Sequence, residues 1–506
     1  MYDVILLTDI TNYSMTFKTI GTYKIASVLR SHGYSVIVMD HFMWMIKNHK
    51  EEVFKWLDDC IGDNTLFVGF GTTFMDVFEH GKSFTNRKLR TKLGIKTTRY
   101  DATREFSELM VRLKSYKTKV VLGGQGIQTG KMFNIYKNEI DHWILGLAED
   151  SVIDFVNKIK TGKTIPKIIE SKDVPIVYNF RETIPTFSKE DIIFENEVLP
   201  LEISRGCRFA CKFCSYPLLG RKPTDEYIRS EESLYQEFKY NYDNWGVTQY
   251  QILCDTFNET TDKLKNVQNA VKRAKIDINF WCYIRMDLIN AHPEQLNILR
   301  DLGIRGAFFG IESLYDPAAK AVGKGFGRDK TFKTVEKIKE SWGKDCLLHG
   351  SFIIGLPFET RETASEWVEL LVNRELKIDS VSMNPLRIAP NEGIKTSRFF
   401  TSEFDRNAEM YGYKRGVQMN WENENWTYKS ASIFASKSLA RIYSNAPSPL
   451  THTLRSANYP MALQNGGFSW KEIIHTKDHE GFINKVKKQK GVCLEKYKED
   501  ILYGRI

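Results

Sequence analysis

Leu199-Pro-Leu-Glu-Ile-Ser-Arg-Gly-Cys207-Arg-Phe-Ala-Cys211-Lys-Phe-Cys214 is a short apolar run followed by three closely spaced cysteines. Thiolates hold iron–sulfur clusters, and close spacing lets one loop wrap a cluster. This loop offers three ligands, whereas a cubane bound only by protein has four. The fourth iron is then free to bind a substrate. The pattern predicts a [4Fe–4S] site built for chemistry, with Cys207, Cys211 and Cys214 as its ligands.

Zinc is the alternative occupant of this loop. Zinc sites usually take four Cys or His ligands, often as two close pairs. The chain has no second Cys-x2-Cys pair, and His475 and His479, which do have ligand spacing, lie far from the loop in the sequence. The other five cysteines are isolated and are interpreted as buried small hydrophobes. The spacing therefore favours the cluster over zinc.

The bulk composition is that of an ordinary globular protein. The 506 residues, 42% hydrophobic and 27% charged, allow two to four domains of about 150 residues each. No membrane-spanning run and no signal peptide are recognisable, and the cysteines suggest a reducing compartment, so a cytoplasmic location is expected. The net charge of +9 allows an anionic substrate or nucleic acid, but solvated lysines explain it equally well.

The first 165 residues alternate short apolar runs with amphipathic stretches, which predicts a doubly wound, Rossmann-like α/β domain. Strands are expected at 4–7, 35–39, 66–69, 119–122 and 143–145, and helices at 23–32, 51–60 and 105–113. Ligands of such sheets bind outside the carboxyl ends of the strands. The residues expected in that crevice are Thr72, Thr73, Gly123, Gly124, Gln125 and Gly126. No GxGxxG follows the first strand, which disfavours a nicotinamide or flavin dinucleotide.

After a linker at 166–198, residues 199–395 show a second alternation that predicts a partial, six-stranded (β/α) barrel. Strands are expected at 199–204, 249–254, 278–284, 306–311, 347–354 and 378–384, with helices near 231–243, 260–274, 293–301, 329–341 and 361–373. Function in such barrels lies at the carboxyl ends of the strands. The cysteine loop, Asp255, Arg285, Gly310 to Ser313 and Gly355 to Glu359 all follow strands in this way.

Residues 396–506 are rich in aromatic side chains, and helices are expected near 430–444 and 478–498. This mainly helical region carries no recognisable motif, so substrate recognition is only one hypothesis for it. Its aromatic residues could stack on bases or on a corrin ring, but core packing is the more common use of such residues.

The cysteine loop resembles the signature of radical S-adenosylmethionine (SAM) enzymes. Gly310-Ile-Glu-Ser313, Gly323-Lys-Gly325 and Gly355-Leu-Pro-Phe-Glu-Thr360 follow in the order that this superfamily shows. The first domain resembles the cobalamin-binding domain that precedes the barrel in one large subclass. The matching features are Ile25 to Leu29 leading to Gly33-Tyr34, then Leu122 to Gly124, and Ile140-Asp141 with Glu149.

The resemblance implies roles for individual residues. Cys207, Cys211 and Cys214 would hold three irons, and SAM would chelate the fourth, so that one electron releases a 5′-deoxyadenosyl radical. Phe213 would lie beside the adenine, Arg285 would meet the SAM carboxylate, and Asp255 and Glu312 would meet its amino group or ribose, with Gly310 and Gly355 lining the pocket. Without a ligand, Arg285 could pair with Asp287, Glu312 could cap the following helix, and Phe213 could pack in the core.

The implied function is cobalamin-dependent methylation of an unactivated carbon. The first domain lacks the Asp-x-His-x-x-Gly loop of many cobalamin proteins, so a domain that keeps the fold without the cofactor is an alternative. Further alternatives are a non-methylating radical reaction, such as a cyclisation or rearrangement, and a nucleic-acid-binding metalloprotein. An electron donor such as flavodoxin or ferredoxin is the expected partner, and the substrate could be a small molecule, a peptide or a nucleic acid.

Overall fold

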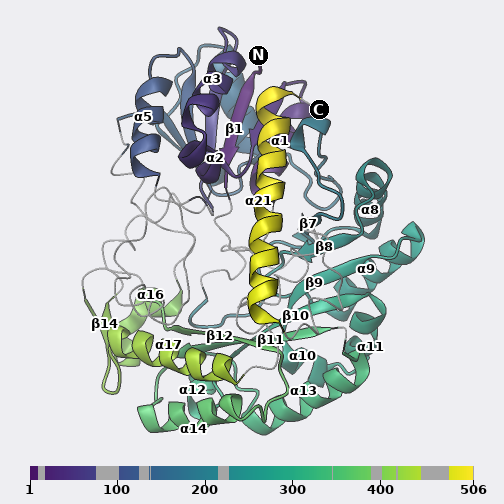
Figure 1. The fold of residues 1–506 in the computed structure, drawn as a ribbon, viewed down its shortest axis with the longest axis vertical. Coiled ribbons are helices and arrows are strands. Elements are labelled where there is room, and N and C mark those ends of the chain that lie inside the picture. The colour runs from purple at the N-terminus through teal and green to yellow at the C-terminus, as the bar shows by residue number, and fades with distance from the viewer. Residues whose placement is uncertain are drawn as a thin grey trace. The chain divides into compact units, whose positions relative to one another are not determined.

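The computed structural model describes residues 1–9, 18–73, 75, 102–124, 136, 138–214, 227–344, 346–388, 402–416, 420–445 and 478–504. Gln125 and Gly126 of the predicted crevice lie outside these residues, as do Phe399, Phe400 and Trp470 of the aromatic region. The chain forms two compact units, one of residues 1–81, 98–195 and 489–506, the other of residues 82–97 and 196–488. Figure 1 shows the fold as a ribbon coloured from the N-terminus to the C-terminus.

The first unit contains a six-stranded parallel sheet in the order β2-β1-β3-β4-β5-β6. The strands are β1 Val4–Thr8, β2 Val36–Met39, β3 Phe67–Gly71, β4 Lys119–Gly123, β5 His142–Leu145 and β6 Ile168–Glu170. Central strands are buried on both faces because continuous apolar runs such as Val4 to Leu7 have no polar side to turn to water. The predicted Rossmann-like architecture is confirmed, and the sheet gains β6 from the segment predicted as a linker.

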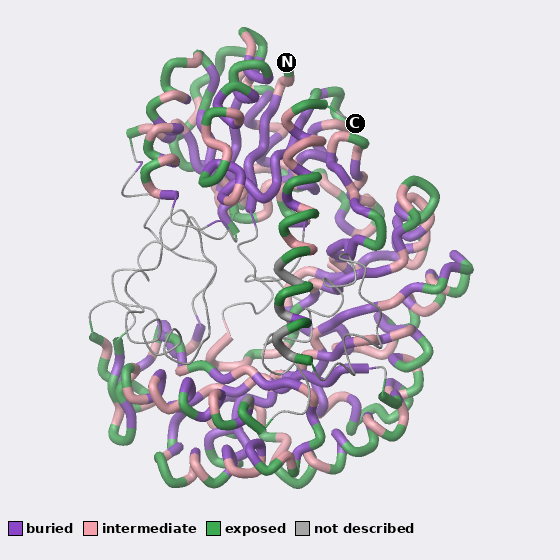
Figure 2. The backbone as a smooth tube through the Cα atoms, in the orientation of Figure 1, coloured by how far each residue is buried: buried purple, intermediate pink, exposed green. Residues whose placement is uncertain are grey.

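Helices pack on this sheet through apolar stripes. They are α1 Ile20–Ser31, α2 Phe42–Asn48, α3 Lys50–Cys60, α5 Thr103–Leu113 and α7 Glu149–Lys160. In α5, Phe106, Leu109, Met110 and Leu113 are buried at helical spacing while the residues between them face solvent. The buried strands and half-exposed helices are distinguished by colour in Figure 2.

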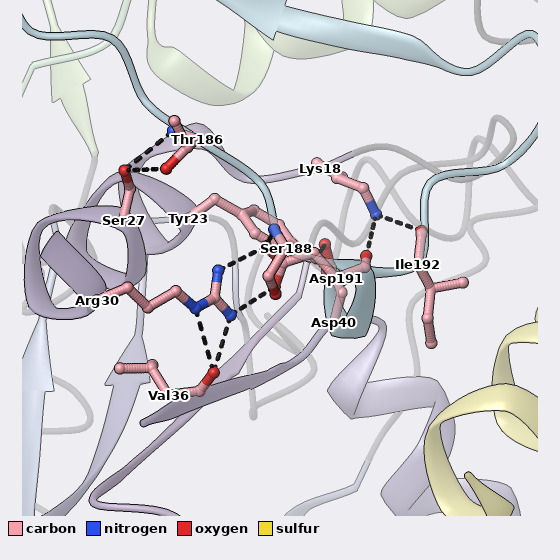
Figure 3. Close-up of polar contacts among 10 residues, drawn as sticks. All are labelled: Lys18, Tyr23, Ser27, Arg30, Val36, Asp40, Thr186, Ser188, Asp191 and Ile192. Carbon is pink, nitrogen blue, oxygen red and sulfur yellow. Dashed lines mark hydrogen bonds and ion pairs between the residues drawn. The ribbon is translucent and has the colours of Figure 1, made fainter. Parts of the chain in front are cut away.

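The segment after β6 is not a free linker within the first unit, because buried polar contacts fasten it to α1 (Figure 3). Arg30 forms a bidentate ion pair with Asp191, at 2.7 and 2.9 Å, and also donates to the carbonyl of Val36 on β2. Lys18 donates to the carbonyls of Asp191 and Ile192, both at 2.9 Å. The Asp191 side chain is fully buried, so this pair fixes the path of the chain as it leaves the sheet.

The second unit contains a parallel six-stranded sheet in chain order, from β7 to β12, as a partial barrel requires. The strands are β7 Val198–Leu201, β8 Gln249–Ile252, β9 Asn279–Ile284, β10 Ile304–Glu312, β11 Leu347–Ile354 and β12 Ser380–Pro385. Every strand predicted for the barrel is present. Between them lie α8 Glu231–Trp245, α9 Thr261–Ala274, α10 Met286–Ala291, α11 Glu294–Asp301, α12 Asp316–Ala321, α13 Arg328–Trp342 and α14 Arg361–Val372.

Local sequence explains where these helices begin. Ser230, Thr260 and Thr360 each accept a hydrogen bond from a backbone N–H in the first turn of α8, α9 and α14. Hydroxyl caps of this kind satisfy donors that the helix itself leaves unpaired. Each cap fixes the first turn of a helix that follows a strand end of the barrel.

The C-terminal region contains α16 Glu403–Asn407, a 3-10 turn at Ala408–Tyr411, a short hairpin of β13 Lys414–Arg415 and β14 Trp421–Glu422, and α17 Tyr428–Ser444. The last helix of the described part of the chain is α21 His479–Tyr503. Residues 489–506 cluster with the first unit, where the Asp40 backbone N–H donates to the Tyr497 hydroxyl at 2.6 Å. Among the described helices, none combines the length and apolar character needed to cross a membrane.

We predict that Arg30→Met lowers the free energy of unfolding of the first unit by about 3 kcal/mol, because it leaves a buried carboxylate unpaired. Lys55→Met is the matched control, because its pair with Asp59 is exposed on both sides and should contribute less than about 1 kcal/mol. Urea unfolding followed by tryptophan fluorescence measures both. Equal losses in the two variants would contradict the assignment of Asp191 as an anchor.

Candidate functional site

The three cysteines lie in the loop that follows β7 at the carboxyl edge of the barrel. Cys207 is 7% exposed, whereas Cys211 and Cys214 are half-buried, and none of the three forms a disulfide. The backbone N–H of Cys214 donates to the carbonyl of Cys211 at 3.0 Å, which forms a tight turn between these two residues. The loop therefore presents two partly exposed sulfurs and one buried sulfur.

The sulfur of Cys207 has a polar side chain beside it. The Thr256 hydroxyl, just beyond β8, lies 3.3 Å from Cys207 Sγ. Burial raises the pKa of the Cys207 thiol, while the Thr256 hydroxyl works in the opposite direction. A bound metal would favour the thiolate by supplying the positive charge that the site lacks.

The donor set fits a cluster better than a single ion. Within the described part of the chain, no three His, Cys, Asp or Glu side chains are grouped to hold one metal ion. Zinc requires its ligands to converge on one point at about 2.0–2.3 Å. A cubane distributes three cysteines over three irons, and soft thiolates are the ligands that iron–sulfur clusters use. The three thiols of this one loop supply the soft donors that such a cluster uses.

Arg285, at the end of β9, points its guanidinium at the cysteine loop. Its Nη1 donates to Cys211 Sγ at 3.3 Å, and its carbon centre lies 4.0 Å from the ring centroid of Phe209. Nε and Nη2 are both occupied by Asp287, at 3.0 and 2.7 Å. The ion pair with Asp287 thus exists, but it is partly buried and it orients a cation toward a cluster ligand. A role for Arg285 at the SAM carboxylate stays a prediction.

The backbone of Arg285 is held as firmly as its side chain. The Arg285 N–H donates to Asn258 Oδ1 at 2.9 Å, and Asn258 Nδ2 donates back to the Arg285 carbonyl at 3.0 Å. Asn258 is fully buried and also donates to Gln295 Oε1 at 3.0 Å. This amide therefore fixes the strand end from which the guanidinium extends.

Asp255 lies between β8 and Thr256 with its side chain exposed to solvent. Protein packed around it still removes much of its hydration, so the pKa of Asp255 rises to about 6, although Lys263 pulls it down. Lys263 itself is buried and donates to Ser204 Oγ at 2.6 Å and to the carbonyl of Thr256 at 2.9 Å. The carboxyl group of Asp255 is thus open to a ligand at the strand edge.

Glu312 ends β10 in a left-handed conformation, with φ of 68°. It is 5% exposed, and burial raises its pKa, which the nearby Lys324 ammonium partly offsets from 3.7 Å. Lys324 also donates to the carbonyl of Gly310 at 3.0 Å. A side chain at Gly310 would collide with the Glu312 carboxylate. Glu312 does not cap the next helix, since α12 begins only at Asp316 and its N-cap residue makes no side-chain bond.

Gly355 follows β11 with φ of 86°, where only glycine is unstrained. Its N–H donates to Glu359 Oε2 at 2.9 Å, and Ser313 Oγ and Trp367 Nε1 donate to Glu359 Oε1 at 3.1 Å each. A Cβ on Gly355 would lie 2.5 Å from the Trp421 ring. The Gly355 loop is therefore built around one buried carboxyl group, and burial raises the pKa of Glu359 to about 7.

Some contacts of this site could not be predicted from the sequence. Phe213 is half-buried, and its proposed place beside an adenine stays a prediction. Thr256 and Asn258 belong to no motif, and their partners are distant in the chain. Lys324 lies inside Gly323-Lys-Gly325, but that motif does not indicate its contacts with Gly310 and Glu312. Phe209 forms the ring beneath Arg285. The only sequence signal for it was weak, namely that it is an aromatic residue inside the cysteine motif.

In the first unit, the carboxyl ends of β3 and β4 are joined by Thr72. Its N–H and its hydroxyl both donate to the carbonyl of Gly123, at 2.9 and 2.8 Å. Thr72 is buried, whereas Thr73 and Gly124 are exposed. Gly124 has φ of 96°, and a Cβ there would lie 2.8 Å from Thr73 Oγ1.

Among the described residues, no atom lies within 4 Å of a Cβ built on Gly123, so this part of the structure leaves the space beside Gly123 open. Small residues and close backbone approach of this kind suit a bulky ligand at the edge of a doubly wound sheet. The described part of this edge thus leaves Thr73, Gly123 and Gly124 accessible to a ligand.

Comparison with known proteins bears on both units. Residues 201–371 match the model of the Radical SAM superfamily. An uncharacterized methyltransferase of Pyrococcus horikoshii is 29% identical over 176 residues, which are 35% of this chain and 36% of that relative. The chain thus matches only about a third of the length of that curated relative.

Two solved structures resemble nearly the whole chain in fold. The radical S-adenosylmethionine methyltransferase TsrM of Kitasatospora setae, with tryptophan substrate and a SAM analogue bound, aligns over 96% of this chain and 99% of its own, with a TM-score of 0.64 and 14% identity. The cobalamin-dependent S-adenosylmethionine radical enzyme OxsB, with aqua-cobalamin and SAM bound, aligns over 97% and 66%, with a TM-score of 0.53 and 14% identity. At 14% identity, these likenesses show the fold alone.

We predict that Arg285→Gln shifts the reduction midpoint of a reconstituted cluster to a more negative value, because it removes a positive charge beside Cys211. For this one-electron couple, a shift of roughly 60 mV corresponds to a tenfold change in the equilibrium constant for reduction of the cluster. Potentiometric titration followed by electron paramagnetic resonance measures it. Arg300→Gln, which removes an exposed arginine, is the control and should leave the midpoint unchanged. The same midpoint in both variants would contradict a role for Arg285 at the cluster.

Proposed function

We propose that this chain, which belongs to the radical SAM superfamily, is a cobalamin-dependent methyltransferase that acts on an unactivated carbon. The observation that carries the proposal is the order of its parts. A Rossmann-like unit with an open, glycine-lined strand edge precedes a partial barrel in which the cysteine loop and Arg285 meet at the strand ends. The TsrM and OxsB likenesses extend across both parts.

In the barrel, Cys207, Cys211 and Cys214 would hold a [4Fe–4S] cluster whose free iron binds SAM. When bound, the reduced cluster supplies the electron that cleaves the sulfonium. The chain contributes placement and charge. Arg285 provides one cation beside Cys211 and would meet the SAM carboxylate, and the exposed Asp255 carboxylate would meet the SAM amino group or a ribose hydroxyl. A guanidinium matches a carboxylate in both charge and geometry.

The other barrel residues would shape the SAM pocket. Because Gly310 has no side chain, it leaves space for the Glu312 carboxylate, which pairs with Lys324 at the end of β10. Gly355 would let the β11 loop pass close to the ligand, and Phe213 would cover the adenine. Burial of these groups would keep water from the reacting atoms, which radical chemistry requires.

In the first unit, Thr73, Gly123 and Gly124 would contact cobalamin, with Thr72 holding the two strand ends together. Gln125 and Gly126, the other two residues predicted for this site, lie outside the described residues. The corrinoid would serve as carrier of the methyl group between SAM and the substrate. The methyltransferase names of TsrM and of the Pyrococcus relative support this outcome. A flavodoxin or ferredoxin is the proposed electron donor.

A non-methylating radical reaction is the second candidate. The observation in its favour is the likeness to OxsB, which is named a cobalamin-dependent radical enzyme without being named a methyltransferase. The two functions differ in their products, because methyl transfer consumes a second SAM.

We predict that the anaerobically reconstituted chain, incubated with SAM, dithionite and hydroxocobalamin, forms both S-adenosylhomocysteine and 5′-deoxyadenosine. Mass spectrometry measures both products, and Cys211→Ala should abolish the deoxyadenosine. Deoxyadenosine alone would favour the non-methylating candidate, since no SAM would then have donated a methyl group. If the protein holds no iron and forms neither product, the proposed function is overturned.

We predict that Gly123→Leu lowers retention of hydroxocobalamin at least tenfold without changing the iron content, because the side chain would occupy the open space at the β4 end. Gel filtration with a corrinoid absorbance spectrum and an iron assay measures both quantities. Gly491→Leu on α21, also with open space around it, is the control. Equal corrinoid retention in both variants would remove this edge as the cobalamin site.

A further inference from the structure

Lys212, between the second and third cysteines, is held from two sides within the barrel unit. Its N–H donates to the carbonyl of Val322 at 3.2 Å, and its own carbonyl accepts from the N–H of Phe404 at 3.2 Å. Its ammonium donates to the Tyr411 hydroxyl at 2.8 Å and lies 5.2 Å from the Tyr411 ring centroid. The cluster loop is thus fastened both to the barrel and to the C-terminal region.

Aromatic contacts continue from this point to the Gly355 loop. Phe404 packs edge-on against Tyr411 at 4.8 Å and against Tyr413 at 5.7 Å, and Tyr413 packs edge-on against Trp421 at 5.2 Å. We call Phe404, Tyr411, Tyr413 and Trp421 the aromatic bridge. Edge-to-face pairs of this kind add to the free energy gained by burial. The bridge therefore runs continuously from the cluster loop to the strand end of β11.

The far end of the aromatic bridge is fastened by hydrogen bonds. The Tyr413 hydroxyl donates to the carbonyl of Gly355 at 2.8 Å, and Trp421 Nε1 donates to the carbonyl of Leu386 at 2.8 Å. Phe404 and Tyr413 are buried to 0% and 1% exposure. Buried polar groups that are satisfied in this way fix one geometry, because breaking either bond leaves an unpaired group.

We propose that the aromatic bridge holds the cluster loop and the Gly355 loop at a fixed separation, with Lys212, Tyr411 and Tyr413 as positioning residues. This inference rests on the proposed function, in that these two loops bind the cluster and SAM. It assigns a role to the C-terminal region that no motif reveals. The loop that supplies the ligands is short, and its contacts with Phe404 and Tyr411, almost 200 positions later in the chain, add to those that it makes with Val322 and Arg285 of the barrel.

The cluster end of the bridge is tested by iron release. Tyr411→Phe and Lys212→Met, each in the reconstituted full chain, should lose iron to an excess of bathophenanthroline about 3- to 10-fold faster, the range expected for one lost hydrogen bond. The double variant should be no faster than either single variant, because both remove the same bond. Lys212→Arg, which keeps a donor, should restore the slow rate, and exposed Lys414→Met is the control. Wild-type rates in Tyr411→Phe and Lys212→Met, or additive effects, would overturn the proposal.

The SAM end is tested by binding. Tyr413→Phe removes the bond to Gly355 and should raise the dissociation constant for SAM about 3- to 10-fold at unchanged iron content, measured by equilibrium dialysis. Tyr428→Phe is the matched control, since Tyr428 packs against the same Trp421 at 6.3 Å without a hydroxyl bond among the described contacts. Equal affinities in the two variants would overturn this half of the proposal.

A third readout separates this proposal from the proposed function, because it needs no cluster. In the cluster-free full chain, Tyr411→Phe should raise the rate of iodoacetamide alkylation at Cys211 and Cys214 relative to half-buried Cys493, which serves as an internal reference. Peptide mass spectrometry measures the ratio. A wild type that takes up no iron would defeat the proposed function while a raised ratio still supports the bridge. A wild type that holds iron, with an unchanged ratio in the variant, would defeat the bridge alone.

Discussion

Parallel pairing from β7 to β12 is the constraint on which the site depends, because it brings every strand end of the barrel to one edge. Residues far apart in the sequence, from Cys207 to Gly355, become neighbours only through this pairing. The contact between Arg285 and Cys211 is its most direct consequence, since it joins the end of β9 to the loop after β7. Nothing in the local sequence of either residue specifies it.

Buried acids organise this edge as much as the cysteines do. Glu359 accepts bonds from Gly355, Ser313 and Trp367, so a single carboxyl group connects the ends of β10 and β11 with α14. Burial opposes its charged form and the three donors favour it, and the balance leaves its pKa near neutrality, at about 7. Glu312 is placed similarly but has a cation, Lys324, as its partner. Both residues were visible in the sequence as strand-end acids, yet their partners were not.

Periodicity predicted the fold well because buried parallel strands are continuous apolar runs that need no tertiary information to recognise. It failed at β6, whose three residues are too short for a pattern, and the anchoring of the following segment by Arg30 and Asp191 depends on contacts 161 residues apart. The cysteine ligands were predictable because their chemistry lies in local spacing. The contacts of Thr256, Asn258 and Lys324 were not predictable, because each of these residues acts through a partner that only folding brings near.

The C-terminal region shows why spacing alone cannot delimit a site. Its aromatic residues could form a stacking surface, although the sequence favoured core packing, and in the structure Tyr413 and Trp421 are core by burial. Yet the core they form is shared with two loops of the barrel edge, so its packing bears directly on where those loops lie. A buried aromatic residue can thus affect chemistry without touching a ligand, provided that the polar group of its ring is hydrogen-bonded to backbone that contacts the ligand.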